Sequence, residues 1–308
     1  MKRCVVLGAN GFIGSHVTAE LVRAGHEVLA CDIAREFTAL ADVPRDRLRT
    51  VTFDFLDAAA LDRIVEGKDW VFHFVSTTLP ATSNENMPFD VQSNVIGSIH
   101  LLEACVRGGV RRVLFASSGG TVYGRPAAVP VPEDAAQDPI VSYGIAKLAI
   151  EKYCRLFEEL HGLSTTCLRL ANPFGPHHFG SLQGIIPVAL RRIGAGEPVV
   201  IWGDGEVVRD YVYVTDVARA FRLAAEYDGE QRVFNVGSGE GVSLNQLLER
   251  IRAVVGRPFP VLYDRGRRFD VPQIYLDVTR AREHLGWRPE VNLTEGLERT
   301  WRDLAREG

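Results

Sequence analysis

Two side chains with complementary chemistry, Tyr143 and Lys147, stand four residues apart in the segment YGIAK. On an α-helix this spacing places both side chains on one face. An ammonium beside a phenol favours the phenolate, lowers the pKa of the phenol from about 10 toward neutrality, and so creates a general base for an alcohol proton. Ordinary amphipathic surface helices carry the same spacing. Whether this Tyr/Lys pair is catalytic must therefore be judged from the other segments of the sequence.

A glycine-rich turn near the N-terminus, GANGFIG, supplies a second chemical signal through Gly8, Gly11 and Gly14. It follows a short apolar run and opens a helical pattern, an arrangement that lets the backbone approach a pyrophosphate and place it on a helix N-terminus. Asp32 follows 18 residues after Gly14, at the end of the next predicted strand. A carboxylate there accepts hydrogen bonds from a ribose and repels a 2′-phosphate, which predicts NAD rather than NADP as the cofactor.

Asp54 ends a third predicted strand, where it is equally compatible with the adenine edge of a dinucleotide and with an ordinary turn or helix cap. The formal net charge of −4 gives no bulk attraction to nucleic acid or acidic membranes. Five scattered cysteines without CxxC spacing favour neither a disulfide framework nor a zinc site, and the sequence predicts no metal. The first residues do not resemble a signal peptide, so a cytoplasmic protein is expected.

The elements that must position these residues alternate between short apolar runs and helical patterns, which predicts an α/β fold with a doubly wound, Rossmann-type parallel sheet. Strands are expected at 3–8, 27–32, 48–54, 70–75, 111–118 and 164–170, and helices at 12–24, 58–66, 91–107 and 142–161. In the last helix Leu148, Ile150, Phe157 and Leu160 are available for burial.

After residue 171 the pattern loosens and Pro and Gly become frequent. Strands are expected at 198–203, 209–214 and 232–237, with helices at 243–255 and 294–305. The sequence therefore predicts an NAD-binding domain at 1–171, which includes the Tyr/Lys helix, and a smaller α/β substrate lobe at 172–308, with segments that return to the first domain.

As an ordered set, these segments resemble the extended short-chain dehydrogenase/reductase family, in its NAD-dependent sugar-nucleotide epimerase/dehydratase branch. The resemblance covers nearly the whole chain. Besides Asp32, its motifs are GANGFIG at 8–14, HFVS at 73–76, NVIGSIHLLEAC at 94–105, SSGGTVYG at 117–124, YGIAK at 143–147, RLANPFGP at 169–176, GDGEVVRDYVYVTDVARA at 203–220 and FNVGSG at 234–239.

The resemblance implies that Tyr143 is the catalytic base and that Lys147 is its electrostatic partner and binds the nicotinamide ribose. Many relatives carry a Ser or Thr that bonds the sugar 4-oxygen where this chain has Gly119. Thr121 and Ser118 are the available substitutes. Alternation along an extended chain favours Thr121, although both hydroxyls could simply satisfy backbone groups at a strand end.

Further site residues follow from the same resemblance. The cofactor-binding set is Gly8, Gly11, Phe12, Ile13, Gly14, Asp32, Asp54, Phe55, Phe74, Val75, Ser76, Asn94, Ser117, Tyr143 and Lys147. The substrate-binding set is Thr78, Thr121, Asn172, Val200, Trp202, Arg209, Arg267 and Asp270, with Arg268 as a competitor for Arg267 and Ile274 at a sugar-pocket position. The adjacent His177 and His178 are expected to be solvated loop residues more often than substrate contacts.

The resemblance also narrows the reaction. Sugar dehydratases of the family carry an acidic pair where this chain has Gly120 and Thr121, so 4-epimerisation of a neutral UDP-hexose through a 4-keto intermediate is expected. The alternatives are an NAD(P)H-dependent NDP-4-ketosugar reductase, an epimerase of N-acetylated or uronic UDP-sugars, and a catalytically silent NAD-sensing protein. The helical segments 91–107 and 142–161 resemble those that form a four-helix homodimer interface in the family, although their apolar stripe could be internal core instead.

Overall fold

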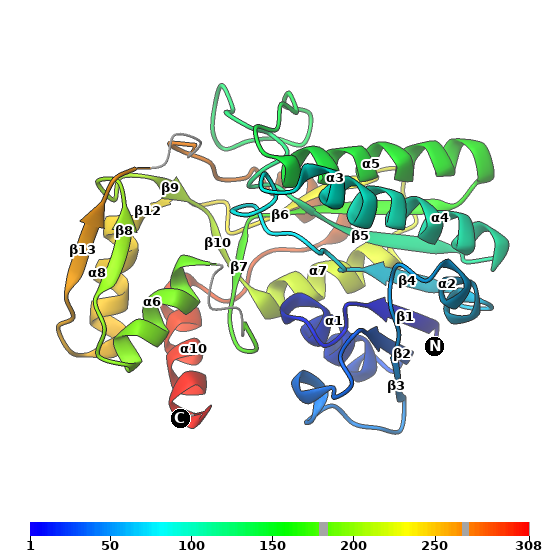
Figure 1. Ribbon diagram of the computed structural model, residues 1–308, viewed down its shortest axis with the longest axis horizontal. Coiled ribbons are helices and arrows are strands. Elements are labelled where there is room, and N and C mark those ends of the chain that lie inside the picture. The colour runs from blue at the N-terminus through cyan, green and yellow to red at the C-terminus, as the bar shows by residue number, and fades with distance from the viewer. Residues whose placement is uncertain (179–183, 267–270, 308) are drawn as a thin grey trace.

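The computed structural model describes residues 1–178, 184–266 and 271–307. Its centre is a seven-stranded parallel sheet in the order β11-β6-β5-β4-β1-β2-β3 (Figure 1). The strands are β1 (Arg3–Leu7), β2 (Glu27–Asp32), β3 (Leu48–Thr52), β4 (Trp70–His73), β5 (Arg112–Ser118), β6 (Ser164–Leu170) and β11 (Val233–Val236). The strand order reverses beside β1 and β4, and such a switch point is where ligands bind in open α/β sheets.

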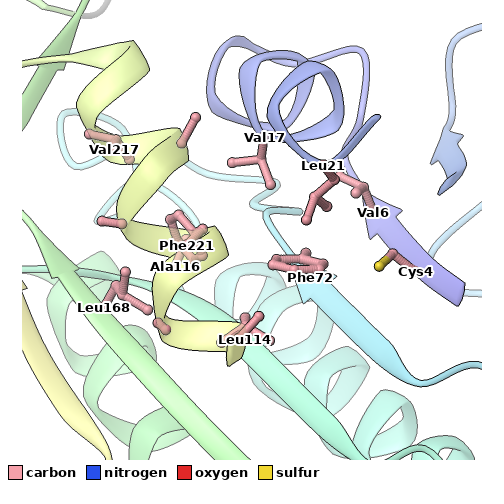
Figure 2. Close-up of a cluster of buried hydrophobic side chains, with 14 of the residues drawn as sticks. Cys4, Val6, Val17, Leu21, Phe72, Leu114, Ala116, Leu168, Val217 and Phe221 are labelled. Atoms are coloured by element: carbon pink, nitrogen blue, oxygen red, sulfur yellow. The ribbon is translucent and has the colours of Figure 1, made fainter. Parts of the chain in front are cut away.

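The inner strands of this sheet alternate their side chains between two apolar layers, because a parallel sheet covered by helices is buried on both faces. On one face Cys4, Val6, Phe72, Leu114 and Leu168 pack under helix α1 (Phe12–Arg23) and helix α7 (Val214–Glu226) (Figure 2). Figure 2 shows Val17 and Leu21 of α1 and Val217 and Phe221 of α7 above these strands. This layer fixes the start of α1 relative to the carboxyl ends of the strands.

The other face of the sheet is covered by α2 (Ala58–Val65), α4 (Gly97–Arg107) and α5 (Ser142–His161). Ahead of α4 lie the short helix α3 (Met87–Asp90) and a π-helix, η2 (Val91–Ile96). The predicted helix at 142–161 is confirmed at both ends, and Ile150 and Phe157 are buried. Leu160, which was also available for burial, is 65% exposed in the single chain.

A second group of elements lies beside the sheet in Figure 1 and has its own core. It contains α6 (Ile185–Gly194), β8 (Val199–Trp202), α8 (Leu244–Val255), β13 (Val261–Asp264) and α10 (Leu293–Glu307), with β8 and β13 paired in parallel. The remaining elements are η1 (Thr38–Leu40), β7 (Asn172–Phe174), β9 (Val208–Arg209), β10 (Tyr211–Tyr213), β12 (Val242–Ser243) and α9 (Thr279–Leu285).

The chain crosses between the two groups more than once. After β8 it returns through α7, which packs on α1, and through β11, which pairs with β6 at the edge of the main sheet. The strand expected at 232–237 therefore belongs to the large sheet. None of the helices that the structure describes has the length and apolar character needed to cross a bilayer.

Candidate active site

The glycine turn lies between the end of β1 and the start of α1. Gly8 has a φ of 82°, in the left-handed region that favours glycine, and a Cβ atom on Gly14 would overlap the carbonyl oxygen of Gly8. Gly11 precedes the first turn of α1 and has no side chain that could cap it, so the first N–H groups of α1 are available to an anion. Phe12 and Ile13, both half-buried, form this first turn.

Asp32 lies directly beside this turn. Its Oδ2 atom accepts a hydrogen bond from the Asn10 backbone N–H at 2.9 Å, and its Oδ1 atom accepts one from the Ala34 N–H at 3.2 Å. An ionised carboxylate has about four acceptor positions, so it can still receive hydroxyl groups of a ribose. The glycine turn, the open end of α1 and Asp32 together fit the pyrophosphate and ribose of a dinucleotide.

The ends of β3 and β4 line the same edge of the sheet. A Cβ atom on Gly8 would touch the backbone of Phe74 and Val75, so the segment after β4 lies against the glycine turn. Asp54 is exposed, and its Oδ1 atom accepts a hydrogen bond from Leu56 N–H at 2.9 Å, an ordinary turn contact. Phe55 is buried against His73, with 5.0 Å between the ring centroids.

Tyr143 and Lys147 share one face of α5 and meet the carboxyl end of β5. The Lys147 Nζ atom donates a hydrogen bond to the Ala116 carbonyl oxygen at 2.9 Å and lies 5.4 Å from the centroid of the Tyr143 ring. The Tyr143 hydroxyl forms a hydrogen bond with the Ser76 side chain in the loop after β4. Both residues therefore lie at the carboxyl end of β5, at the edge of the sheet where β1 runs into the glycine turn.

The expected effect of Lys147 on Tyr143 is not found. Burial, together with the nearby Asp90, raises the pKa of Tyr143 to about 12, and only the hydrogen bond with Ser76 acts in the opposite direction. Burial also lowers the pKa of Lys147 to about 8, against the attraction of Asp90 and Glu151. The physical reason is that the ammonium lies over the aromatic ring and donates to a backbone carbonyl, while both groups are withdrawn from water. In this structure the phenol holds its proton at neutral pH.

The hydroxyls after β5 are arranged by a turn. The chain leaves the strand at Ser118, and the N–H groups of Thr121 and Val122 both donate to the Ser118 carbonyl oxygen, at 3.2 and 3.0 Å. The alternation argument for Thr121 is therefore wrong, because residues 119–121 are not extended. A different observation supports Thr121: its Oγ1 atom is buried and has no hydrogen-bond partner among the described residues.

Thr121 also lies next to helix α5. A Cβ atom on Gly144, the residue after Tyr143, would come within 2.9 Å of the Thr121 carbonyl oxygen. Ser118 is half-buried at the strand end. A buried hydroxyl without a hydrogen-bond partner lowers the stability of the folded protein. Its presence near Tyr143 is typical of a group that hydrogen-bonds a ligand.

Leu276 explains why residue 119 is glycine. A Cβ atom on Gly119 would lie 2.6 Å from one methyl group of Leu276 and 3.2 Å from the Arg169 carbonyl oxygen. Leu276 is itself buried, in a small cluster that includes Ile274. This leucine therefore fills the space that a Ser or Thr side chain would need at position 119.

Ser117 belongs to a buried polar network that the sequence did not predict. Its hydroxyl donates to Glu151 Oε1, and Glu151 forms a buried ion pair with Arg169 at 2.7 Å. Arg169 also donates to the Tyr123 hydroxyl at 3.0 Å and to the Glu133 carbonyl oxygen at 2.9 Å. Glu151 follows Lys147 by one helical turn, which is the signal that could have linked it to the site.

Asn94 and Thr78 are held by protein groups. Asn94 Oδ1 accepts from the Thr77 N–H at 3.0 Å, and its amide donates to Asp90 at 2.8 Å and to Thr78 Oγ1 at 3.1 Å. These contacts fix the loop that carries Ser76. A direct cofactor role for Asn94 and a substrate role for Thr78 stay predictions.

The predicted substrate residues lie on several segments. The Asn172 amide donates to the Asp210 carbonyl oxygen at 2.8 Å, and Arg209 Nη1 donates to the carbonyl oxygens of Val208 and Val271, at 2.8 and 2.6 Å. Trp202, at the end of β8, is 42% exposed, and Val200 is half-buried. Arg267, Arg268 and Asp270 lie outside the described residues.

The expectation of solvated histidines is wrong. His178 stacks on Phe12 at 4.2 Å between ring centroids, and His177 stacks on His16 at 5.2 Å. Both are half-buried, and burial lowers the pKa of His178 to about 4. The loop after β7 is therefore packed on the first turns of α1, where its histidine rings cover helix surface.

Comparison with known proteins places this geometry in a family. Residues 4–237 match the model described as the NAD dependent epimerase/dehydratase family. The chain belongs to this family. The family and the cofactor expected from the sequence are thereby confirmed, and NAD is the cofactor that the glycine turn and Asp32 fit.

Individual relatives extend over the whole chain. A UDP-glucose 4-epimerase of Mycolicibacterium smegmatis is 36% identical over 97% of each chain. A dTDP-4-dehydro-6-deoxyglucose reductase of Escherichia coli is 33% identical over 96% of this chain and 95% of its own. The crystal structure of a UDP-glucose 4-epimerase from Thermotoga maritima with UDP-glucose superposes with a TM-score of 0.92 at 37% identity, over 99% of both chains.

Proposed function

We propose that this chain is an NAD-dependent 4-epimerase of a UDP-hexose of the UDP-glucose/UDP-galactose type. The observation that carries the proposal is that Tyr143 and Lys147 lie together at the carboxyl end of β5, next to a turn in which the Thr121 hydroxyl is buried without a partner among the described residues. The near full-length similarity to UDP-glucose 4-epimerases of two organisms supports the substrate class.

Each residue has a defined task in this proposal. In its phenolate form Tyr143 would accept the proton of the sugar 4-hydroxyl and return it when the 4-keto group is reduced. Thr121 Oγ1 would donate a hydrogen bond to the 4-oxygen, and the Lys147 ammonium would stabilise the phenolate. The glycine turn and Asp32 would hold NAD, which would supply reversible hydride transfer with the sugar. The sugar leaves with inverted configuration at one carbon and no net oxidation, so the protein needs no external redox partner.

Binding of the nucleotide is proposed for the residues beside the second lobe. Arg209 and Arg267 would pair with the diphosphate, Asn172 would donate to it, Val200 and Trp202 would flank the base, and Asp270 would bind the ribose. We further propose residues 1–171 as the NAD-binding domain and 172–308 as mainly the substrate lobe.

We propose a homodimer built on the α4 and α5 side of the molecule. Ile96, Ile145, Leu156 and Leu160 expose between 36% and 65% of their surface, and the last three form one stripe along α5. Four such helices, two from each copy, would cover these side chains. A cytoplasmic location is also proposed, because all five cysteines are free and buried, as in a reducing compartment.

The experiment uses purified protein without added cofactor. UDP-glucose, UDP-galactose, their N-acetylated forms and UDP-glucuronic acid are incubated separately, and the anomeric protons are followed by NMR. Interconversion of UDP-glucose and UDP-galactose is expected, and interconversion of another pair would change the sugar but keep the reaction. Tyr143→Phe serves as the control and should reduce turnover by about 100- to 10,000-fold, since it removes the acid–base group.

A reductase is the second candidate, because the Escherichia coli relative carries that name at 33% identity. It would use Tyr143 and Lys147 in the same way but would consume one reduced cofactor in each cycle. Absence of interconversion for every UDP-sugar, together with NADH oxidation by a 4-ketosugar nucleotide, would replace the epimerase proposal with this one.

A further inference from the structure

Asp90 is a fully buried carboxylate, with no exposed surface, at the end of α3. Its Oδ1 atom accepts hydrogen bonds from Thr78 Oγ1 at 2.5 Å and from the Asn94 amide at 2.8 Å. Its Oδ2 atom accepts one from Ser142 Oγ at 2.5 Å. No ion pair joins Asp90 to a Lys, Arg or His of the described residues, and its hydrogen-bond donors, Thr78, Asn94 and Ser142, are all neutral.

The three donors come from three separate segments that surround the active site. Thr78 belongs to the loop after β4, which also carries Ser76, the hydrogen-bond partner of Tyr143. Asn94 lies in the π-helix η2, a rare geometry that is often found at functional sites. Ser142 is the first residue of α5 and immediately precedes Tyr143.

The first turn of α5 is held from the same side. The helix has no side-chain cap of its own at Val141. Instead, Asn84 Oδ1 accepts a hydrogen bond from the Ser142 N–H at 2.9 Å, and Ser83 Oγ accepts one from the Tyr143 N–H at 3.1 Å. The first N–H groups of an α-helix have no partner within the helix. In α5 two of them bond to residues 83 and 84, which lie in the segment that precedes Asp90.

We propose that Asp90 is a positioning residue of this active site, which ties the loop after β4 to the first turn of α5 and supplies a negative charge beside Tyr143 and Lys147. Acting through Ser142, it fixes where the Tyr143 hydroxyl lies. This inference rests on the proposed function for the catalytic role of Tyr143. The hydrogen bonds of Asp90 are seen in the structure and do not depend on that role.

The charge effect has a defined sign. Asp90 raises the pKa of Tyr143 and opposes the loss of the proton from Lys147. The other charged or titratable groups that face this pair are Glu151 on α5, which also favours the ammonium, and His73 on β4, whose own pKa is lowered to about 3 by burial and by Lys147. Removing the charge of Asp90 alone should make both Tyr143 and Lys147 more acidic.

The test compares Asp90→Asn with the wild type. Asparagine keeps the volume and can still accept from Thr78, but it carries no charge. We expect the pKa of Tyr143 to fall by about 1 unit. The titration of Tyr143 alone is obtained by subtracting the tyrosinate absorbance of a Tyr143→Phe variant from that of the matching protein with Tyr143. This difference is measured once for the wild type and once for Asp90→Asn, and the two titration curves are compared. This readout needs no substrate, so it remains decisive even if the chain proves not to be an epimerase.

The second measurement is the pH dependence of kcat. Both limbs of the pH profile of kcat should move toward lower pH in Asp90→Asn. In Ser142→Ala, which keeps the charge and removes one tie, kcat should fall about tenfold without a shift of the profile. Asp57→Asn, at an exposed helix cap outside the site, is the matched control and should change neither.

An unmoved tyrosinate titration in Asp90→Asn would overturn the electrostatic part of the proposal, and an unchanged kcat in Ser142→Ala would overturn the positioning part. If Asp90→Asn fails to fold, Thr78→Val takes its place. That variant removes one donor to the carboxylate, and wild-type values of kcat and KM in it would count against Asp90 as a tie between the two segments.

Discussion

The hydroxyl of Thr121 is buried without a hydrogen-bond partner among the described residues, a state that costs about 1 to 3 kcal/mol. Such a hydroxyl is expected where a bound ligand supplies the missing hydrogen bond. Stability and activity should therefore respond in opposite ways when the hydroxyl is removed.

Replacement of Thr121 by Val tests this directly. We expect kcat/KM to fall by about 100- to 1000-fold, as when one donor to a developing oxyanion is lost. The free energy of unfolding in urea should stay the same or rise by about 1 kcal/mol, because an unsatisfied polar atom is replaced by a methyl group. Ser118→Ala is the control, and a large loss of activity there with a normal Thr121→Val enzyme would transfer the role to Ser118.

Lys147 makes the pH dependence of this site predictable. Its pKa, lowered to about 8, means that the ammonium is present below pH 8 and is lost above it. Turnover that needs the ammonium should fall about tenfold per pH unit above pH 8.

Stability should respond to Lys147 in the opposite direction over the same range. Between pH 8 and the unfolded value of about 10.5, the unfolded chain binds the proton and the folded chain does not, so stability rises with pH. In Lys147→Met this rise should disappear from urea titrations at several pH values. A rise of equal size in the variant would mean that other groups cause it.

At the scale of single residues, the sequence predicted the types that do chemistry but not their surroundings. Tyr143, Lys147 and the glycines could be found because their spacing has a local meaning on a helix or a turn. Asp90, Ser83 and Asn84 could not, because their contacts exist only after the fold brings a distant loop against α5.

Helix α7 is the element that completes the face of the sheet shown in Figure 2. Phe221 is fully buried there, and its ring meets Phe74 edge to face at 4.7 Å between centroids. Phe74 belongs to the segment that contacts the glycine turn. Packing on α7 therefore supports the cofactor end of the site from behind.

Truncation of the Phe221 side chain tests how much its packing stabilises the protein. Phe221→Ala should lower the free energy of unfolding by about 3 to 5 kcal/mol, because it leaves a cavity between α7 and the sheet. Phe259→Ala, at a half-buried ring in the second lobe, is the comparison and should cost less. Equal losses in urea unfolding would show that the interior next to Phe221 relaxes to fill the space.

The elements themselves were predicted unevenly for a physical reason. All seven strands of the main sheet and α5 were predicted because runs of β-branched and apolar residues, or a long amphipathic period, identify them locally. The place of β11 in this sheet was not predicted, because pairing with β6 is a long-range contact. The pattern did not predict α7, although Val217, Phe221 and Ala224 recur at helical spacing, because it follows directly on the strand-like segment YVYV. The π-helix η2 has no local signal, since its side-chain contacts with Thr77 and Thr78 belong to the folded state.

The molecule as a whole presents an apolar stripe on α5 that no described residue covers. The proposed homodimer accounts for it. At micromolar concentration the wild type should sediment at twice 34.0 kDa, and Leu156→Glu should shift it to the monomer, because a buried unpaired charge opposes association.

Leu262→Glu is the matched control for this experiment, since Leu262 is 53% exposed on β13, away from α5. It should leave the sedimentation unchanged. A wild type that sediments only at 34.0 kDa would reject the dimer, and a Leu156→Glu chain that remains dimeric would place the interface elsewhere on the surface.

The return of α7 and β11 to the main sheet has a consequence for how the protein is made. When the ribosome has completed β6, α7 is still missing, and Leu114 of β5 and Leu168 of β6 lack the helix that covers them in the folded protein. The chain must then be extended through β8 before α7 and β11 emerge. Throughout that interval the nascent chain carries an open apolar surface and an unpaired strand edge at β6, the combination that holdase chaperones bind and that aggregates when they are scarce.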